Sequence, residues 1–144
     1  MAGRPIDAVT RSRMMAAVKS RDTMPERIMT AMLAENGVEF ETHSEMAGTP
    51  DVVVRSRKVA IFVNGCFWHW HGCRQSSVPR SNRSFWLRKL VNNRLRDRRN
   101  ARFLRSRGWR VITVWECGLS LPRRMATFRR VLSLLGVQHG AASG

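Results

Sequence analysis

Apolar residues recur at helical spacing in three stretches of the chain. The first helix is expected to begin at Thr23, which forms a capping-box sequence with Glu26, and to end before Gly37. A second, long helix is predicted over residues 83–107 and a third over residues 122–135, each followed directly by a glycine. The chain therefore contains enough amphipathic helix to cover a sheet.

Short apolar runs rich in β-branched residues lie between these helices. Residues 52–54 and 59–63 are predicted to form a strand hairpin across a basic turn, and residues 109–115 alternate as a further strand. A short extended piece is expected at residues 38–40, whereas residues 64–82 have loop character. This order of elements predicts an α/β fold in which a mixed sheet is flanked by helices.

Length and composition fit one compact domain. The chain has 144 residues, of which 43% are hydrophobic, and this is enough for a single core. We expect a basic arm over residues 1–22, one domain over residues 23–136 and a disordered tail over residues 137–144. No apolar run approaches the ~20 residues of a membrane span, and the start of the chain lacks the apolar core of a signal peptide. These features predict a cytoplasmic protein.

The net charge indicates the class of partner. The chain carries 26 Lys and Arg against 10 Asp and Glu, a formal charge of +16, with a pI near 11.8. Such a field concentrates polyanions, and most of the basic residues are Arg, which binds phosphate in a bidentate manner. Nucleic acid is the partner that this favours, although a basic ribosome-associated protein without chemistry would have the same charge.

All three cysteines belong to one group of metal-binding residue types. Thiolates and imidazoles at short spacing suit tetrahedral zinc, which needs four ligands, and the sequence offers five candidates: Cys66, His69, His71, Cys73 and Cys117. If all the cysteines bind, one histidine remains for proton transfer. Buried thiols beside unrelated histidines are the alternative.

Asp51 stands after Pro50, at the mouth of the predicted hairpin. A carboxylate at a strand end can hold Mg²⁺ against a phosphate, because this hard cation prefers oxygen ligands. An Asp that follows a Pro also commonly makes nothing more than a turn.

Aromatic residues flank the same region. Phe67 and Trp68 lie beside the histidines, and Trp86 opens the basic helix. Exposed aromatic rings next to Arg can insert between bases, whereas packing in a core is the ordinary position of Phe and Trp. Both possibilities remain open from the residues alone.

Four segments together resemble one family. They are TPDVVV, NGCFWHWHGC, SFWLRKLVNNRLRDRR and GWRVITVWEC, and the similarity runs from about Thr10 to Cys117. The segments closely resemble the very short patch repair (Vsr) DNA mismatch endonucleases. The resemblance implies a restriction-endonuclease-like fold with a structural zinc site. It also implies an enzyme that nicks one strand 5′ to the thymine of a T:G mismatch, the product of 5-methylcytosine deamination.

The resemblance assigns the catalytic residues. Asp51 matches a magnesium-binding carboxylate, to whose site the backbone carbonyl of Val63 would add a ligand, and His69 matches the catalytic histidine. Glu26 matches an acid near the active site. Two departures stand out: Asn64 occupies a position where some relatives have a histidine, and no Glu-x-Lys follows Asp51 as in ordinary restriction-type nucleases. A histidine would then replace the usual lysine.

The same resemblance assigns the remaining contacts. The implied zinc ligands are Cys66, His71, Cys73 and Cys117. The aromatics that would intercalate at the mismatch are Phe67, Trp68 and Trp86. We expect the DNA backbone to be held by basic residues of the long helix, namely Arg88, Lys89, Arg94 and Arg98.

The expected partner is double-stranded DNA with a T:G mismatch, bound by a monomer because an asymmetric mismatch has no two-fold axis. The resemblance also implies association with the bacterial nucleoid, while the sequence leaves open whether mismatch-repair proteins assist. Two other classes stay possible: a zinc-dependent DNA-binding module without catalysis, and a less selective defence nuclease of the same fold.

Overall fold

A mixed α/β architecture is seen in the computed structural model, which describes residues 23–69, 71–73 and 77–137. The described helices are α2 (Met24–Glu35), α3 (Arg83–Ser106) and α4 (Leu121–Leu135), and the strands are β1 (Glu41–Thr42), β2 (Val52–Val54), β3 (Val59–Asn64) and β4 (Arg110–Trp115). The sheet order is β1-β2-β3-β4, with antiparallel pairs except for the parallel pair β3/β4. The prediction of a mixed sheet flanked by helices is therefore confirmed.

The predicted hairpin, its basic turn, and the three helices lie where the sequence placed them, with boundaries shifted by one or two residues. The extended piece expected at residues 38–40 leads directly into β1, the strand that pairs with β2. Residues 38–40 are not part of a strand, and Val38 and Phe40 pack against the hydrophobic core. Their apolar character reflects burial of a loop, which periodicity cannot distinguish from a strand.

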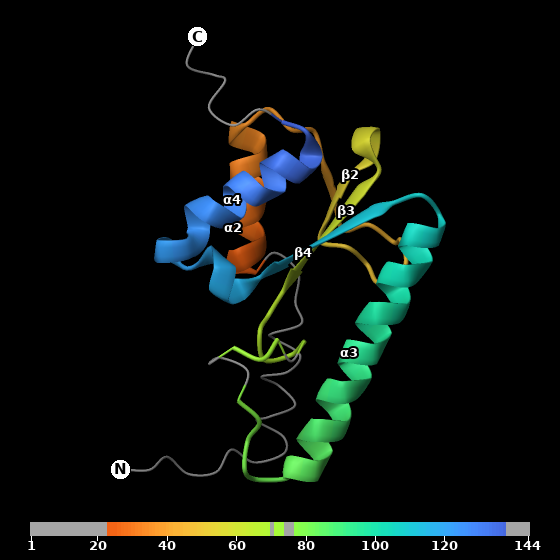
Figure 1. The fold of residues 1–144 in the computed structure, drawn as a ribbon, viewed down its shortest axis with the longest axis vertical. Helices are drawn as coiled ribbons and strands as arrows, with labels where there is room; N and C mark the ends of the chain where they lie inside the picture. The colour runs from red at the N-terminus through yellow and green to blue at the C-terminus, as the bar shows by residue number, and fades with distance from the viewer. Residues whose placement is uncertain (1–22, 70, 74–76, 138–144) are drawn as a thin grey trace.

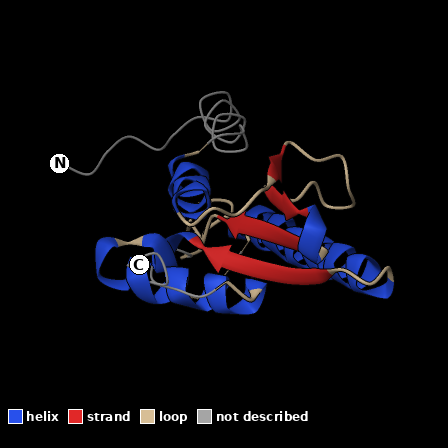
Figure 2. Cartoon of the chain, turned by 90° about the horizontal axis from the view of Figure 1, so that it is seen from above, coloured by secondary structure: helices blue, strands red, loops and turns tan. Residues whose placement is uncertain are grey.

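The helices cover opposite faces of the sheet (Figure 1). Helices α2 and α4 pack against the main core, whose strand residues include Val54, Ile61 and Val114. Helix α3 lies on the other side of the strands, and the view from above shows the same layering (Figure 2). It turns Leu90 and Leu104 inward. Among the described residues, no helix has the length and apolar character needed to cross a membrane.

The strand register brings three chain segments to one edge of the sheet. Because β3 and β4 are parallel and Asn64 pairs with Trp115, the segments that follow these strands leave the sheet side by side. Strand β2 is antiparallel to β3, and Val52 pairs with Ile61. Residue 51, which directly precedes β2, therefore lies beside the last residues of β3. The loop with the predicted chemistry starts at this edge.

Candidate active site and metal centre

A cleft of about 590 Å³ opens at this edge of the sheet, between α2 and α3. Its lining comes from the first turn of α2, the start of β2, the end of β3, the following loop and the middle of α3. The lining residues with functional groups of interest are Glu26, Asp51, Val63, Trp68, His69 and Asp97. The three catalytic residues predicted from the sequence thus lie in one cavity.

Asp51 is held across the hairpin. The backbone N–H of Val63 donates a hydrogen bond to Asp51 Oδ2 at 2.7 Å. Burial, together with the neighbouring carboxyl of Glu26, raises the pKa of Asp51 to about 7, although the Val63 N–H and His69 act in the opposite direction. Two acids held this close repel each other when both are ionised, so a divalent cation between them would be stabilising. The oxygen donors are of the type that Mg²⁺ prefers.

Glu26 reaches this position from the N-terminus of α2. The predicted capping box does not form its usual backbone hydrogen bond, because the Thr23 hydroxyl donates to Glu26 Oε1 at 3.2 Å instead. Pro25, in the first turn, needs no N–H partner there. The capping-box sequence therefore positions an acid in the cleft and does not cap the N-terminus of α2.

His69 is paired with a residue that sequence reasoning did not single out as functional. His69 Nδ1 forms a hydrogen bond with the carboxylate of Asp97 on α3. When Nδ1–H donates to this carboxylate, the imidazole is oriented and Nε2 is the nitrogen that can accept a proton. A signal was present in the sequence, since Asp97 is the only acidic residue of Arg83–Ser106.

Asn93 is a second residue that the sequence analysis missed. It is a buried polar side chain of α3, and its Nδ2 donates to the backbone carbonyl of Trp68 at 3.0 Å. Arg96 donates in turn to Asn93 Oδ1 at 3.3 Å. These hydrogen bonds fasten the loop that carries His69 to the helix that carries Asp97.

A cluster of sulfur and nitrogen donors lies next to the cleft. The ligand atoms of four residues all lie within 4.8 Å of one another: Cys66, His71, Cys73 and Cys117. His71 Nδ1 is 3.5 Å from Cys117 Sγ and 3.8 Å from Cys66 Sγ, close to the roughly 3.5–3.8 Å edges of a tetrahedron with zinc-type bond lengths. The residues fit a four-coordinate soft-metal centre.

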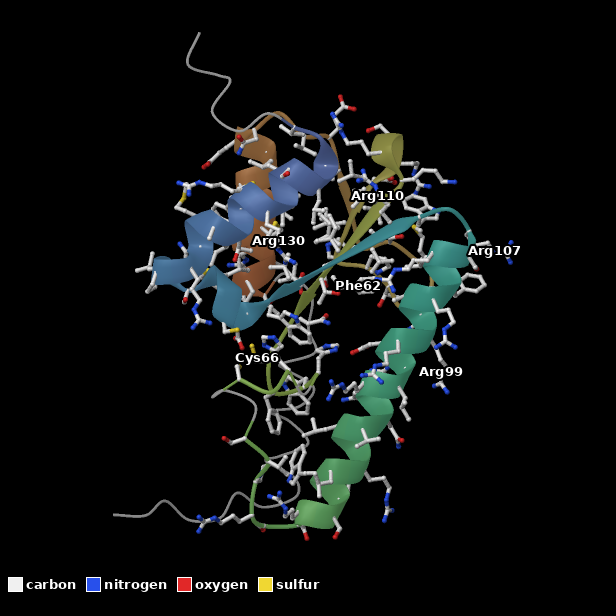
Figure 3. All side chains as sticks on the ribbon, viewed as in Figure 1. Phe62, Cys66, Arg99, Arg107, Arg110 and Arg130 are labelled. Atoms are coloured by element: carbon white, nitrogen blue, oxygen red, sulfur yellow. The ribbon has the colours of Figure 1, made fainter. Side chains whose placement is uncertain are left out.

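The parallel pair β3/β4 explains this cluster. Cys66 and Cys117 each follow a strand end by two residues, and those ends are in register. His71 stacks on Trp115 with ring centroids 4.0 Å apart and an interplanar angle of 4°. Burial raises the pKa of Cys66 to about 12, so in the absence of a metal its thiol keeps the proton that a bound metal would displace. The Cys66 side chain is visible at the end of β3 (Figure 3).

The three predicted intercalating aromatics form one cluster. Phe67 lies 5.0 Å from Trp68 and 5.5 Å from Trp86 between ring centroids, and the two Trp rings are 6.0 Å apart. Phe67 and Trp68 are partly exposed, whereas Trp86 is only 3% exposed. The structure brings the three rings together, and Trp86 is the buried member of the cluster.

The predicted backbone-binding residues spread along α3. Arg88, Arg94 and Arg98 are exposed and Lys89 is half-buried. Basic side chains follow the whole length of the helix, and the labelled Arg99 points away from the sheet (Figure 3). The helix is therefore a basic surface that begins beside the aromatic cluster and continues past the cleft.

Comparison with known proteins gives a consistent family. Residues 5–75 match the model of the family described as DNA mismatch endonuclease Vsr. The chain is 43% identical over 121 residues to the type II nicking enzyme V.XorIIP of Xanthomonas oryzae pv. oryzae, covering 83% of this chain and 89% of that protein. It is 42% identical over 114 residues to the DNA mismatch endonuclease Vsr of Escherichia coli K12, covering 78% and 73%. This chain therefore belongs to the Vsr family of DNA mismatch endonucleases.

Proposed function

We propose that this protein is a DNA endonuclease that uses Mg²⁺ to nick one strand 5′ to the thymine of a T:G mismatch. The observation that carries the proposal is the cleft itself, where a carboxyl pair, Asp51 and Glu26, lies beside a histidine oriented by Asp97. Family membership supports the endonuclease activity, and the T:G preference follows from the resemblance of the motifs. In this proposal the sheet and its flanking helices are a restriction-endonuclease-like core.

The chain's own groups supply the proton transfer. His69 accepts a proton at Nε2 from the attacking water, while Asp97 holds Nδ1–H and stabilises the imidazolium that forms. Mg²⁺, when bound by Asp51 and the backbone carbonyl of Val63, supplies Lewis-acid polarisation of the scissile phosphate. Glu26 places a second carboxyl group next to that of Asp51. The water oxygen bonds to phosphorus as the P–O3′ bond breaks, and the leaving 3′ oxygen takes a proton from solvent, so the products carry a 5′-phosphate and a 3′-hydroxyl.

The metal centre has a structural function in this proposal. Zn²⁺, when bound by Cys66, His71, Cys73 and Cys117, ties the loop after β3 to the segment after β4. His69 lies between two of these ligands in sequence, and a small displacement of a catalytic group costs large factors in rate. A rigid loop therefore keeps His69 opposite Asp97.

The aromatic cluster selects the mismatch. Phe67 and Trp68 are the partly exposed members, and we propose that they insert beside the mismatched pair, which unstacks at lower cost than a matched pair. Insertion of Trp86 requires a local rearrangement that exposes its ring, because the side chain is only 3% exposed.

The remaining features complete the proposed complex. The domain spans residues 23–136, and Arg88, Lys89, Arg94 and Arg98 hold phosphates of the duplex. The basic arm predicted over residues 1–22 lies outside the described residues, as does the tail predicted over residues 137–144 apart from Val137. One copy of the protein acts on each mismatch.

The decisive experiment uses end-labelled duplexes with one T:G mismatch and matched T:A duplexes in varied flanking sequence. Purified protein is incubated with and without Mg²⁺, and zinc is retained in both arms by omitting Mg²⁺ rather than adding a chelator. We expect nicking of only the thymine strand, only with Mg²⁺. Binding without nicking would instead indicate a non-catalytic zinc module, and equal nicking of both duplexes would indicate a less selective nuclease.

A further inference from the structure

A second concavity lies next to the cleft, along the adjoining face of α3. It has a volume of about 510 Å³ and runs between α3 and β4. We call it the arginine groove, defined by Arg94, Arg98, Arg102, Arg105, Thr113 and Trp115. It shares Asn64, His69 and Asp97 with the cleft, so the two concavities meet at the catalytic histidine.

The four arginines form a row along one side of the helix. They differ by four, four and three positions, which places successive residues about 4.5–6 Å apart along the axis. In the described part of the chain, Arg98, Arg102 and Arg105 form no ion pair with a carboxylate. The one acid of the helix, Asp97, is already bonded to His69.

This row does not serve helix stability. Like charges at i, i+4 destabilise a helix by a few tenths of a kcal/mol per pair. Asp97 is the one acidic residue of α3 that could offset this repulsion. A regular row of guanidinium groups is suited to an extended polyanion rather than to a single small anion. Trp115, which also lines the groove, has one ring face stacked on His71, so that face is unavailable to a base.

We propose that the arginine groove binds the sugar–phosphate backbone of the substrate duplex on one flank of the scissile phosphate. The inference rests on the proposed function and extends it, because Arg102 and Arg105 become DNA-binding residues beyond those expected from the sequence. The duplex bound in the cleft continues past His69 into the groove, where the arginine row follows its phosphates.

The test compares two double variants with the same loss of charge. Arg102→Ala with Arg105→Ala removes the new part of the groove, and Arg123→Ala with Arg129→Ala removes two exposed arginines of α4 that line neither concavity. Affinity for a matched T:A duplex is measured by fluorescence anisotropy at several NaCl concentrations. A T:G duplex, whose mismatch fixes the position of the protein, is then lengthened stepwise on each side of the mismatch in the absence of Mg²⁺.

The groove variant is expected to lose about 2 units of the slope of log K against log [salt] and to bind tenfold or more weakly at about 0.1 M salt. The α4 variant is expected to retain most of the slope. Wild-type affinity should rise as one flank is lengthened, and this rise should be absent in the groove variant.

Other outcomes distinguish failure of the groove proposal from failure of the proposed function. A groove variant with the wild-type slope overturns the groove proposal, even if nicking of T:G duplexes is normal. A complex of one protein with two duplexes, lost in the groove variant, also overturns it, because the groove would then bind separate DNA. If the wild type nicks no duplex, the proposed function fails, while the salt slopes still decide whether the groove binds DNA.

Discussion

The cleft and the metal centre share one edge of the sheet but use opposite chemistry. The cleft gathers oxygen donors from Asp51 and Glu26, whereas the metal centre gathers sulfur and nitrogen donors. His69 and His71 are two residues apart, yet one contacts Asp97 on α3 and the other stacks on Trp115 of β4. A short loop can therefore lie between a group of oxygen donors and a group of sulfur and nitrogen donors when its histidines contact different elements.

Replacement of His69 should remove catalysis and leave metal binding intact. His69→Ala should lower single-turnover nicking by about 10³-fold or more, because the group that accepts the proton is lost. Zinc content per protein and the unfolding transition should stay close to wild type. Radiolabelled nicking assays and elemental analysis measure the two quantities, and substantial nicking by this variant would contradict the assignment of the base.

Breaking the metal centre should have the converse outcome. Cys117→Ser should abolish stoichiometric zinc and lower the free energy of unfolding by about 3 kcal/mol or more, because metal binding contributes directly to folding. Urea unfolding with and without added zinc measures this. Loss of stability without loss of zinc would show that Cys117 is not a ligand.

Asp97→Asn tests the pairing between the loop and α3. The amide cannot stabilise an imidazolium and can favour the wrong tautomer of His69, so we expect nicking to fall by about 10²-fold. KM for DNA should change little, because the carboxylate of Asp97 contacts His69. A uniform fall in DNA affinity would instead indicate a structural contact.

The acid pair predicts a pH dependence of stability in the absence of Mg²⁺. Asp51 has a pKa of about 7 in the folded protein against an ordinary value of 3.8, so between these values the folded state holds a proton that the unfolded state has lost. Stability should therefore decrease as pH rises from about 4 to 7, by on the order of 2–4 kcal/mol from this group.

Asp51→Asn provides the control for that dependence. The variant should lose most of this pH dependence and be more stable than the metal-free wild type above pH 7. Added Mg²⁺ should stabilise the wild type at that pH and leave the variant unchanged. Urea unfolding across the pH range measures both effects, and parallel pH profiles for the two proteins would contradict the burial argument.

The smallest expected effect concerns the aromatic cluster. Trp68→Ala should reduce the preference for T:G over T:A duplexes by about tenfold, while binding to matched DNA changes by less than threefold. Phe85→Ala, an exposed aromatic that contacts Trp86, serves as the matched control. Equal losses of discrimination and of general binding would exclude insertion by Trp68.

Part of this site could be predicted from local sequence. The spacing of Cys66, His69, His71 and Cys73 indicates a metal-binding loop, and Pro50-Asp51 marks a strand end, because both features depend on neighbours in the chain. Glu26 was recognisable only through the resemblance, since as a capping-box acid it suggested a purely local function. The side chain instead faces Asp51, which is 25 positions away.

Local sequence is enough to predict the helices from their periodicity and the hairpin from its β-branched residues. It is also enough to predict the basic surface from charge and the types of metal ligand from donor chemistry, because all of these are properties of short segments. The tertiary structure decided which groups meet. The parallel register of β3 and β4 brought Cys117 to Cys66, and the crossing of α3 brought Asp97 to His69. These contacts join segments far apart in the chain, and long-range contacts depend on packing geometry that local preference does not encode.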